Sequence, residues 1–151
     1  MISIVAVGKI KEKSLQNLID EYLKRICGYT KISITEVADE PNDRNDVLQT
    51  EGQRILKQIK DDAYVILLDL QGREVDSVSF SKLIQDINTY RASHIVFVIG
   101  GSLGVSGEVR KRADYRLKIS EMTFPHNLAR LIILEQIYRA YKIANNETYH
   151  K

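Results

Sequence analysis

Apolar positions follow two alternating patterns along this chain, short continuous runs and longer stripes at helical spacing. The continuous runs lie at residues 2–7, 63–70 and 94–99 and are typical of buried strands. Two shorter strands are expected at 31–37 and 115–119, and helices at 15–26, 46–60, 80–91, 106–113 and 128–144. Because strands alternate with helices throughout, the pattern predicts an α/β fold. We expect one domain over residues 1–151, with a mostly parallel sheet flanked by helices.

Three details depart from this regular pattern. Gln71-Gly72-Arg73 is interpreted as the turn that ends the strand at 63–70. Gly52 lies inside a predicted helix, where glycine costs about 1 kcal/mol relative to alanine, so the helix is expected to break or to pack closely there. Cys27 falls on an apolar helix face and is predicted to belong to the core.

The last helix, at 128–144, is apolar over more than half of its circumference. A surface helix buries one stripe of roughly 100° or more, so this helix is predicted to need two partners. One is its own sheet, and we expect the other to be a second copy of the chain. The loop at 121–126, just before this helix, would then lie near a subunit boundary and is a natural ligand site.

Composition and charge restrict the function only weakly. Hydrophobic residues make up 44% and charged residues 28%, which are ordinary values for a globular protein, and the net charge is +2. A single cysteine excludes an intramolecular disulfide, and no apolar run approaches the roughly 18 residues of a membrane span, so a soluble, cytoplasmic protein is expected. Basic residues gather near the start and at 110–118, which could steer a polyanion, although solvated helix faces explain them equally well.

The glycine-rich turn from Gly100 to Gly104 lies between a predicted strand and a predicted helix. Such turns face ligands in α/β sheets, although a glycine pair is also a common structural device. The Gly-x-Gly-x-x-Gly fingerprint and the Gly-Lys-Ser/Thr phosphate loop are both absent, which argues against NAD and nucleoside triphosphates. No spacing of metal ligands and no Gly-x-Ser-x-Gly motif is present, so we expect no metal and no hydrolase nucleophile.

Two of the three histidines are candidates for chemistry. His126 lies in the first turn of the last helix, where the helix dipole favours a neutral imidazole that could accept a proton or bind a ligand. A capping or packing role for His126 is an equal alternative. His150 lies in a polar tail between Tyr149 and Lys151, a set suited to contacting a phosphate and a base, although such termini usually fray. His94, at the start of a strand, is expected to be structural.

Six segments in the same order resemble one known family over essentially the whole chain. They are Val5-Ala6-Val7-Gly8-Lys9, Glu51-Gly52, Phe97-Val98-Ile99-Gly100-Gly101-Ser102-Leu103-Gly104, Met122-Thr123-Phe124-Pro125-His126, Glu135-Gln136-Ile137-Tyr138-Arg139-Ala140 and Tyr149-His150-Lys151. This set closely resembles the RlmH family, small bacterial SPOUT-class enzymes that methylate N3 of a pseudouridine in large-subunit (23S) ribosomal RNA.

The resemblance implies a SPOUT-type fold with a trefoil knot in the C-terminal half, a homodimer, and S-adenosylmethionine as the methyl donor. By analogy with the family, the donor contacts fall on Leu68, Gly100, Ile119, Ser120, Glu121, Met122, Thr123 and Phe124. Glu121 is expected to contribute its backbone rather than its side chain.

The resemblance also bears on the acceptor side of the reaction. N3 is an imide N–H that must lose its proton, so His150 or His126 could act as the base, and Tyr149 could stack on the target base. The RNA, as part of the assembled ribosome, is expected to bind across both subunits through Lys9, Lys11, Arg25, Arg139 and Lys151. The alternative is a non-catalytic RNA- or ribosome-binding dimer of the same fold.

Overall fold

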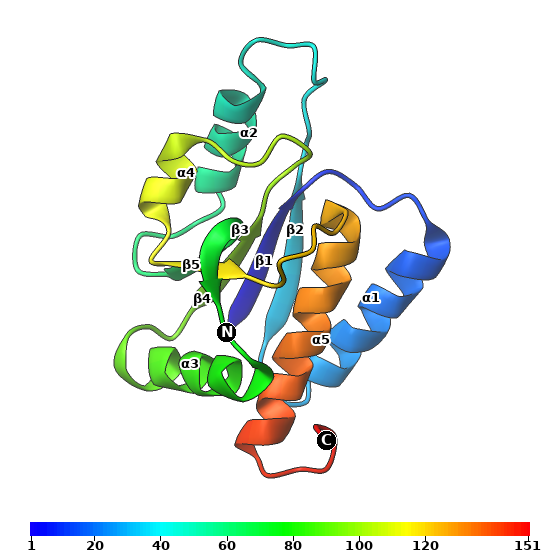
Figure 1. The fold of residues 1–151 in the computed structure, drawn as a ribbon, viewed down its shortest axis with the longest axis vertical. Helices are drawn as coiled ribbons and strands as arrows, with labels where there is room; N and C mark the ends of the chain where they lie inside the picture. The colour runs from blue at the N-terminus through cyan, green and yellow to red at the C-terminus, as the bar shows by residue number, and fades with distance from the viewer.

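Five strands alternate with five helices in the computed structural model, which describes all 151 residues (Figure 1). The strands are β1 (Ile2–Val7), β2 (Ile32–Val37), β3 (Tyr64–Glu74), β4 (Ile95–Ile99) and β5 (Tyr115–Lys118). The helices are α1 (Lys13–Ile26), α2 (Val47–Leu56), α3 (Ser77–Tyr90), α4 (Gly107–Arg112) and α5 (His126–Ala144). No helix has the length and apolarity needed to cross a bilayer.

The strands form one parallel sheet in the order β2-β1-β4-β3-β5. This confirms the predicted α/β class. The continuous apolar runs belong to β1, β4 and β3, the three central strands, because these strands are covered on both faces. The trefoil knot stays a prediction.

Two hydrophobic cores lie on opposite faces of the sheet, since successive side chains of a strand point to opposite sides. In β1, Ile4 belongs to the core under α1, α3 and α5, whereas Val5 belongs to the core under α2 and α4. Figure 1 shows these two layers of helices on either side of the strands. Because all five strands are parallel, their carboxyl ends lie at one edge of the sheet, together with the loops that lead to the following helices.

The sequence interpretation of β3 was wrong at its end, because the strand continues through Glu74 rather than turning at Gly72. The pairing with β5 shifts between Leu68 and Arg73, both of which lie opposite Leu117. A Cβ atom at Gly72 would lie 2.6 Å from the carbonyl oxygen of Arg116. Glycine is thus needed here because the backbone of β5 approaches closely.

Two smaller expectations are resolved by local packing. The helix around Gly52 does not break, although α2 ends at Leu56, four residues before the predicted end; instead, a Cβ at Gly52 would lie 2.4 Å from Ser106 Oγ. This confirms the alternative of close packing. Cys27 is exposed at the C-cap of α1, so its predicted place in the core was wrong, because the helix ends at the buried Ile26 and Cys27 lies beyond it.

Helix α5 lies on the sheet between α1 and α3 (Figure 1). These two neighbours cover its flanks, so most of its wide apolar surface is explained within one chain. Leu128 is still 39% exposed and Ile132 is half-buried. Only the exposed side of α5, around Leu128 and Ile132, is therefore left to contact a second copy of the chain.

Candidate active site

A cavity of about 560 Å³ opens at the carboxyl edge of the sheet. Its walls are the end of β3, the turn after β4 and the loop between β5 and α5. Seven of the eight residues expected to contact the donor line it, namely Leu68, Gly100, Ile119, Ser120, Met122, Thr123 and Phe124. The eighth, Glu121, points outward, with its side chain 77% exposed and paired with Lys118. The structure therefore gathers three predicted segments around one space.

The glycine turn after β4 has a shape that side chains would prevent. A Cβ at Gly100 would lie 2.7 Å from both the carbonyl oxygen of Gly104 and Val105 Cγ1. The turn closes through a hydrogen bond from Gly104 N to Gly101 O at 3.1 Å, and Gly104 has a φ of 90°, in the left-handed region. Because these positions carry no side chains, the backbone itself forms this wall of the cavity.

Behind the turn lies a buried carboxylate that sequence reasoning did not single out as functional. Glu51 of α2 is 4% exposed, and its Oε2 accepts a hydrogen bond from Glu40 N at 2.9 Å. A Cβ at Gly101 would lie 3.1 Å from Glu51 Oε1. Glu51 therefore lies between the glycine turn and the segment around Glu40 that precedes α2.

Asp69 and Arg110 also line the cavity and were missed by the sequence analysis. The Asp69 side chain is 10% exposed, and its Oδ1 accepts a hydrogen bond from Gln71 N at 2.9 Å. Its Oδ2 lies 3.8 Å from Arg110 Nε and 3.5 Å from Arg116 Nη1, and has no hydrogen-bond partner. The only sequence signal was an aspartate at the carboxyl end of a central strand.

His126 begins α5 and lines the same cavity. A Cβ at Gly8 would lie 3.9 Å from His126 Nε2, so the imidazole lies beside the end of β1. One turn later, Arg130 is 1% exposed, donates from Nη1 to Glu36 Oε2 at 2.6 Å and from Nη2 to Gly8 O at 3.2 Å. These bonds tie α5 to the ends of β1 and β2 and so hold His126 in place.

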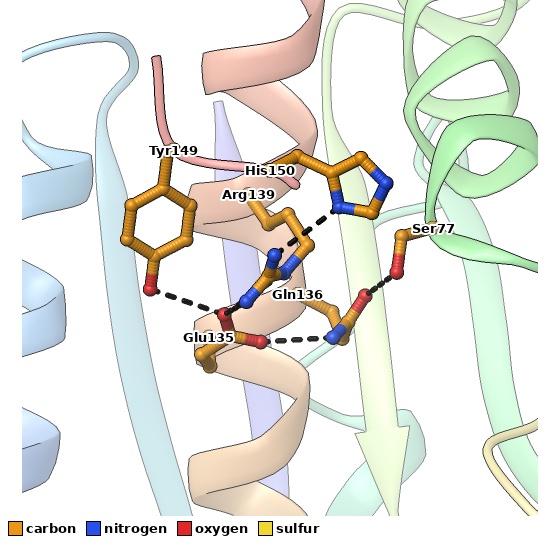
Figure 2. A network of polar contacts seen from close by, with 6 residues as sticks. All are labelled: Ser77, Glu135, Gln136, Arg139, Tyr149 and His150. Carbon is orange, nitrogen blue, oxygen red and sulfur yellow. Dashed lines mark hydrogen bonds and ion pairs between the residues drawn. The ribbon is translucent and has the colours of Figure 1, made fainter.

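The C-terminal tail docks on α5 through a polar network (Figure 2). Tyr149 OH donates to Glu135 Oε1 at 3.1 Å, and the Arg139 guanidinium lies 4.8 Å from the centre of the Tyr149 ring. Arg139 Nη1 lies 3.2 Å from His150 Nδ1. Burial, together with a hydrogen bond to Tyr22 and the nearby Glu135 carboxylate, raises the pKa of Tyr149, so its hydroxyl stays protonated at neutral pH.

The tail does not line the cavity of its own chain, although His150 borders a neighbouring hollow that shares Leu117 and Ile119 with that cavity. His126 is 13 residues before Arg139 on α5, which corresponds to about 20 Å at 1.5 Å per residue. His150 instead borders a second hollow between α3 and α5, with Val78, Ile119 and Ile132 among its lining residues. The three catalytic candidates thus occupy two places.

The basic candidates also form two groups. Lys9 and Lys11 are exposed in the loop after β1, at the edge of the sheet that holds the cavity. Arg25 lies near the other end of α5, 5.8 Å from the centre of the Tyr138 ring, on the side where Arg139 meets the tail. Lys151 is exposed at the end of the tail. A polyanion touching all of these residues would have to cross the molecule.

Comparison with known proteins identifies the family of this chain. Residues 1–150 match the model of a family described as "predicted SPOUT methyltransferase". The chain belongs to the SPOUT methyltransferase family. It is 53% identical to a ribosomal RNA large subunit methyltransferase H from Desulfitobacterium hafniense, over 99% of this chain and 98% of that protein. It is 50% identical to the protein of the same name from Clostridium perfringens, over 99% of both chains. These relatives confirm the resemblance to the RlmH family.

A solved structure supports the fold independently. It is described as that of a probable methylase family protein from Haemophilus influenzae, with a TM-score of 0.54 and 15% identity. The match covers 96% of this chain and 66% of that chain. At this identity it supports the architecture alone. Membership of a SPOUT methyltransferase family implies that the chain uses a methyl donor.

Proposed function

We propose that this protein transfers a methyl group from S-adenosylmethionine to N3 of a pseudouridine in 23S ribosomal RNA, acting on the assembled ribosome in the cytoplasm. The observation that carries the proposal is the cavity at the carboxyl edge of the sheet, where seven of the eight expected donor contacts come together. The names of the relatives, at 50–53% identity over nearly the full chain, support ribosomal RNA as the substrate.

The cavity suits the donor in size and in chemistry. Its volume of about 560 Å³ lies within the roughly 300–1,000 Å³ that is usual for small-molecule sites. Gly100 and Gly101 leave backbone open to a polar ligand, while Leu68, Leu117 and Ile119 offer apolar contact to a flat ring. The buried Asp69 Oδ2, which has no hydrogen-bond partner, suits a hydroxyl or an amino group.

The protein's part in the reaction is positioning. When bound, the donor supplies a methyl group bonded to a positively charged sulfur, which is the leaving group, so no metal is required. The loop 119–124 and the glycine turn would hold the donor, and N3 of the pseudouridine would have to lie within about 3–3.5 Å of the methyl carbon. His126 borders this space from α5, whereas Tyr149 and His150 are the candidates for contacting the base.

We propose further that the active site is shared between two copies of the chain. Within one chain, the tail does not line the cavity, and His126 and Arg139 are about 20 Å apart along α5, so the tail would act on the cavity of its partner. Met122 is 74% exposed beside the cavity, and with Leu128 and the half-buried Ile132 it offers an apolar face for the second copy. RNA would then cross both subunits, which suits the two separate groups of basic residues.

Mass mapping of ribosomal RNA after incubation with the protein and labelled donor tests the whole proposal. We expect one methyl group on a pseudouridine of 23S RNA when the substrate is intact ribosomes that lack this mark. If the protein binds such ribosomes but has no affinity for the donor, it is instead a non-catalytic ribosome-binding dimer.

The donor site has a matched pair of glycine substitutions. Gly100→Ala places a Cβ 2.7 Å from Gly104 O and should abolish the rise in Tm that the donor produces by mass action. Gly107→Ala meets no atom within 4 Å and should leave that rise unchanged. If both variants respond to the donor as the unmodified protein does, the cavity is not the donor site.

The tail and the dimer can be tested separately. Deleting Thr148 to Lys151 should spare folding and donor binding but abolish methyl transfer; full activity of the truncated chain would show that the tail is not part of the site. Ile132→Asp should convert a dimer to monomers in sedimentation, and the monomers should bind donor without transferring methyl. A concentration-independent monomer of the unmodified chain would contradict the shared site.

A further inference from the structure

The contact between Arg139 and His150 determines which ring nitrogen of His150 carries the proton. Arg139 Nη1 lies 3.2 Å from His150 Nδ1. A guanidinium has only donors, so Nδ1 must be the acceptor and cannot carry a proton. The proton of the neutral imidazole is therefore on Nε2. A charged imidazolium, with N–H groups at both nitrogens, does not fit this contact.

Arg139 is itself held by a chain of hydrogen bonds (Figure 2). Its Nε donates to Glu135 Oε1 at 3.0 Å, and its Nη2 bonds to the same oxygen. Gln136 Nε2 donates to Glu135 Oε2 at 2.8 Å, and Ser77 Oγ donates to Gln136 Oε1 at 2.7 Å. The hydrogen bonds to Glu135 also raise the pKa of Arg139, which keeps the guanidinium charged. This network fixes the nitrogen that faces His150.

We propose that His150 acts as a neutral hydrogen-bond donor to the target base, through Nε2–H, and not as the base that removes the N3 proton. The proposal rests on the proposed function, in which the tail meets the pseudouridine. Accepting a proton at Nε2 would require the other tautomer, whose Nδ1–H would point at a guanidinium N–H. Glu135 and Arg139 are then positioning residues that select the donor tautomer.

The donor role fits the charge that develops in the reaction. The N3 proton leaves to water, and the resulting negative charge spreads over N3 and the two flanking carbonyl oxygens. The N3 lone pair then forms the bond to the methyl carbon, while the electron pair of the breaking carbon–sulfur bond returns to sulfur and leaves a neutral thioether. His150 Nε2–H would bond one of the two carbonyl oxygens and stabilise the anion, and His150 is neutral before and after the step.

Other charged groups near His150 are few. Asp76 and Lys118 border the same hollow. Asp76 Oδ1 already accepts a hydrogen bond from Ser79 N at 2.7 Å, as the N-cap of α3. Lys118 is paired with Glu121. Among these groups only Arg139 has a polar atom within hydrogen-bond distance of the imidazole, so Arg139 is the group that decides the tautomer.

Two substitutions at one position separate the donor role from the base role. His150→Gln keeps an N–H donor near the place of Nε2 but has no titratable group, whereas His150→Ala removes both. With full-length protein and ribosomes lacking the mark, we expect His150→Ala to lower kcat by about 10²–10³-fold, the usual effect of losing one such donor. We expect His150→Gln to retain most of the activity, and the deficit of His150→Ala to be the same at about pH 7 and about pH 9.5.

Each contrary result has a distinct meaning. If His150→Gln is as inactive as His150→Ala, and the deficit shrinks at high pH where the imide loses its proton unaided, His150 is the base and the inference fails while the shared site stands. If His150→Ala is fully active, the tail does not meet the base, and both this inference and that part of the proposed function fail.

The tautomer itself can be observed without an activity assay. Long-range ¹H–¹⁵N spectra of the histidine-labelled protein should show His150 protonated at Nε2 at neutral pH. In Arg139→Leu the preference for this tautomer should be lost. A ring protonated at Nδ1 in the unmodified protein would overturn the inference.

Discussion

Replacing Gly52 with alanine tests how closely α2 packs against the start of α4. The new Cβ would lie 2.4 Å from Ser106 Oγ and 3.1 Å from Ser106 Cβ. Ser106 is the N-cap of α4, and its Oγ accepts a hydrogen bond from Val109 N at 3.3 Å. To relieve the overlap, the Ser106 side chain must leave this position and the two helices must move apart.

The expected cost follows from three terms. Losing the cap costs about 1 kcal/mol, and overpacking a close contact costs about 1–3 kcal/mol. Alanine in place of glycine inside a helix returns about 1 kcal/mol. Gly52→Ala should therefore lower the free energy of unfolding by about 1–3 kcal/mol. For a chain of this size that corresponds to a fall in Tm of roughly 2–4 °C for each kcal/mol.

A double-mutant cycle in urea identifies the cause of this cost. Ser106→Gly removes both overlapping atoms and is a mild change by itself, because glycine is tolerated as an N-cap. In that background Gly52→Ala should become neutral or stabilising by up to about 1 kcal/mol, from helix propensity alone. If Gly52→Ala costs the same in both backgrounds, the contact with Ser106 is not the reason for the glycine. Because Ser106 follows the glycine turn, the single variant should also weaken donor binding.

Two further predictions concern buried polar groups. Glu36→Ala leaves the Arg130 guanidinium buried without its carboxylate and should lower the free energy of unfolding by about 3 kcal/mol in a denaturant titration, somewhat less if water replaces the partly exposed carboxylate. The control Glu21→Ala breaks an exposed ion pair and should cost less than about 1 kcal/mol. Equal costs for the two variants would refute the reasoning. Burial lowers the pKa of His94 below 6.5, so its contribution to stability is present above pH 6.5 and is lost as the pH falls through the lowered pKa of the folded state. Between pH 7 and pH 5, the Tm of His94→Gln should therefore fall less than the Tm of the unmodified protein. An equal fall in both proteins would exclude this histidine as the cause.

The sequence was sufficient for the elements because their signals are local. A strand covered on both faces is apolar at nearly every position, so β1, β3 and β4 could be predicted from single runs of residues. The end of β3 could not be predicted in this way, because glycine is common in turns and the place of Gly72 in the strand depends on the backbone of β5. The exposure of Cys27 likewise depends on where α1 ends, one residue before it.

The candidate site divides in the same way. The turn from Gly100 to Gly104 and the loop from Ile119 to His126 were predicted, the first from its composition and both from the resemblance to a family. Asp69 was missed, because a single aspartate after a strand has no distinguishing pattern. Its significance comes from an oxygen without a hydrogen-bond partner near Arg110, and that is a property of packing.

Arg130 shows why such residues escape sequence reasoning even when their helix is predicted correctly. In an amphipathic pattern a long cationic side chain is assigned to the solvent face, since unpaired charges are almost never fully buried. Here the partners that make burial possible, Glu36 and Gly8, lie 94 and 122 positions away in sequence. They come within reach of Arg130 only because β1 and β2 are adjacent and parallel, so that their carboxyl ends meet the start of α5. The polar positions most informative about the site are thus determined by strand order, which no local pattern in the chain encodes.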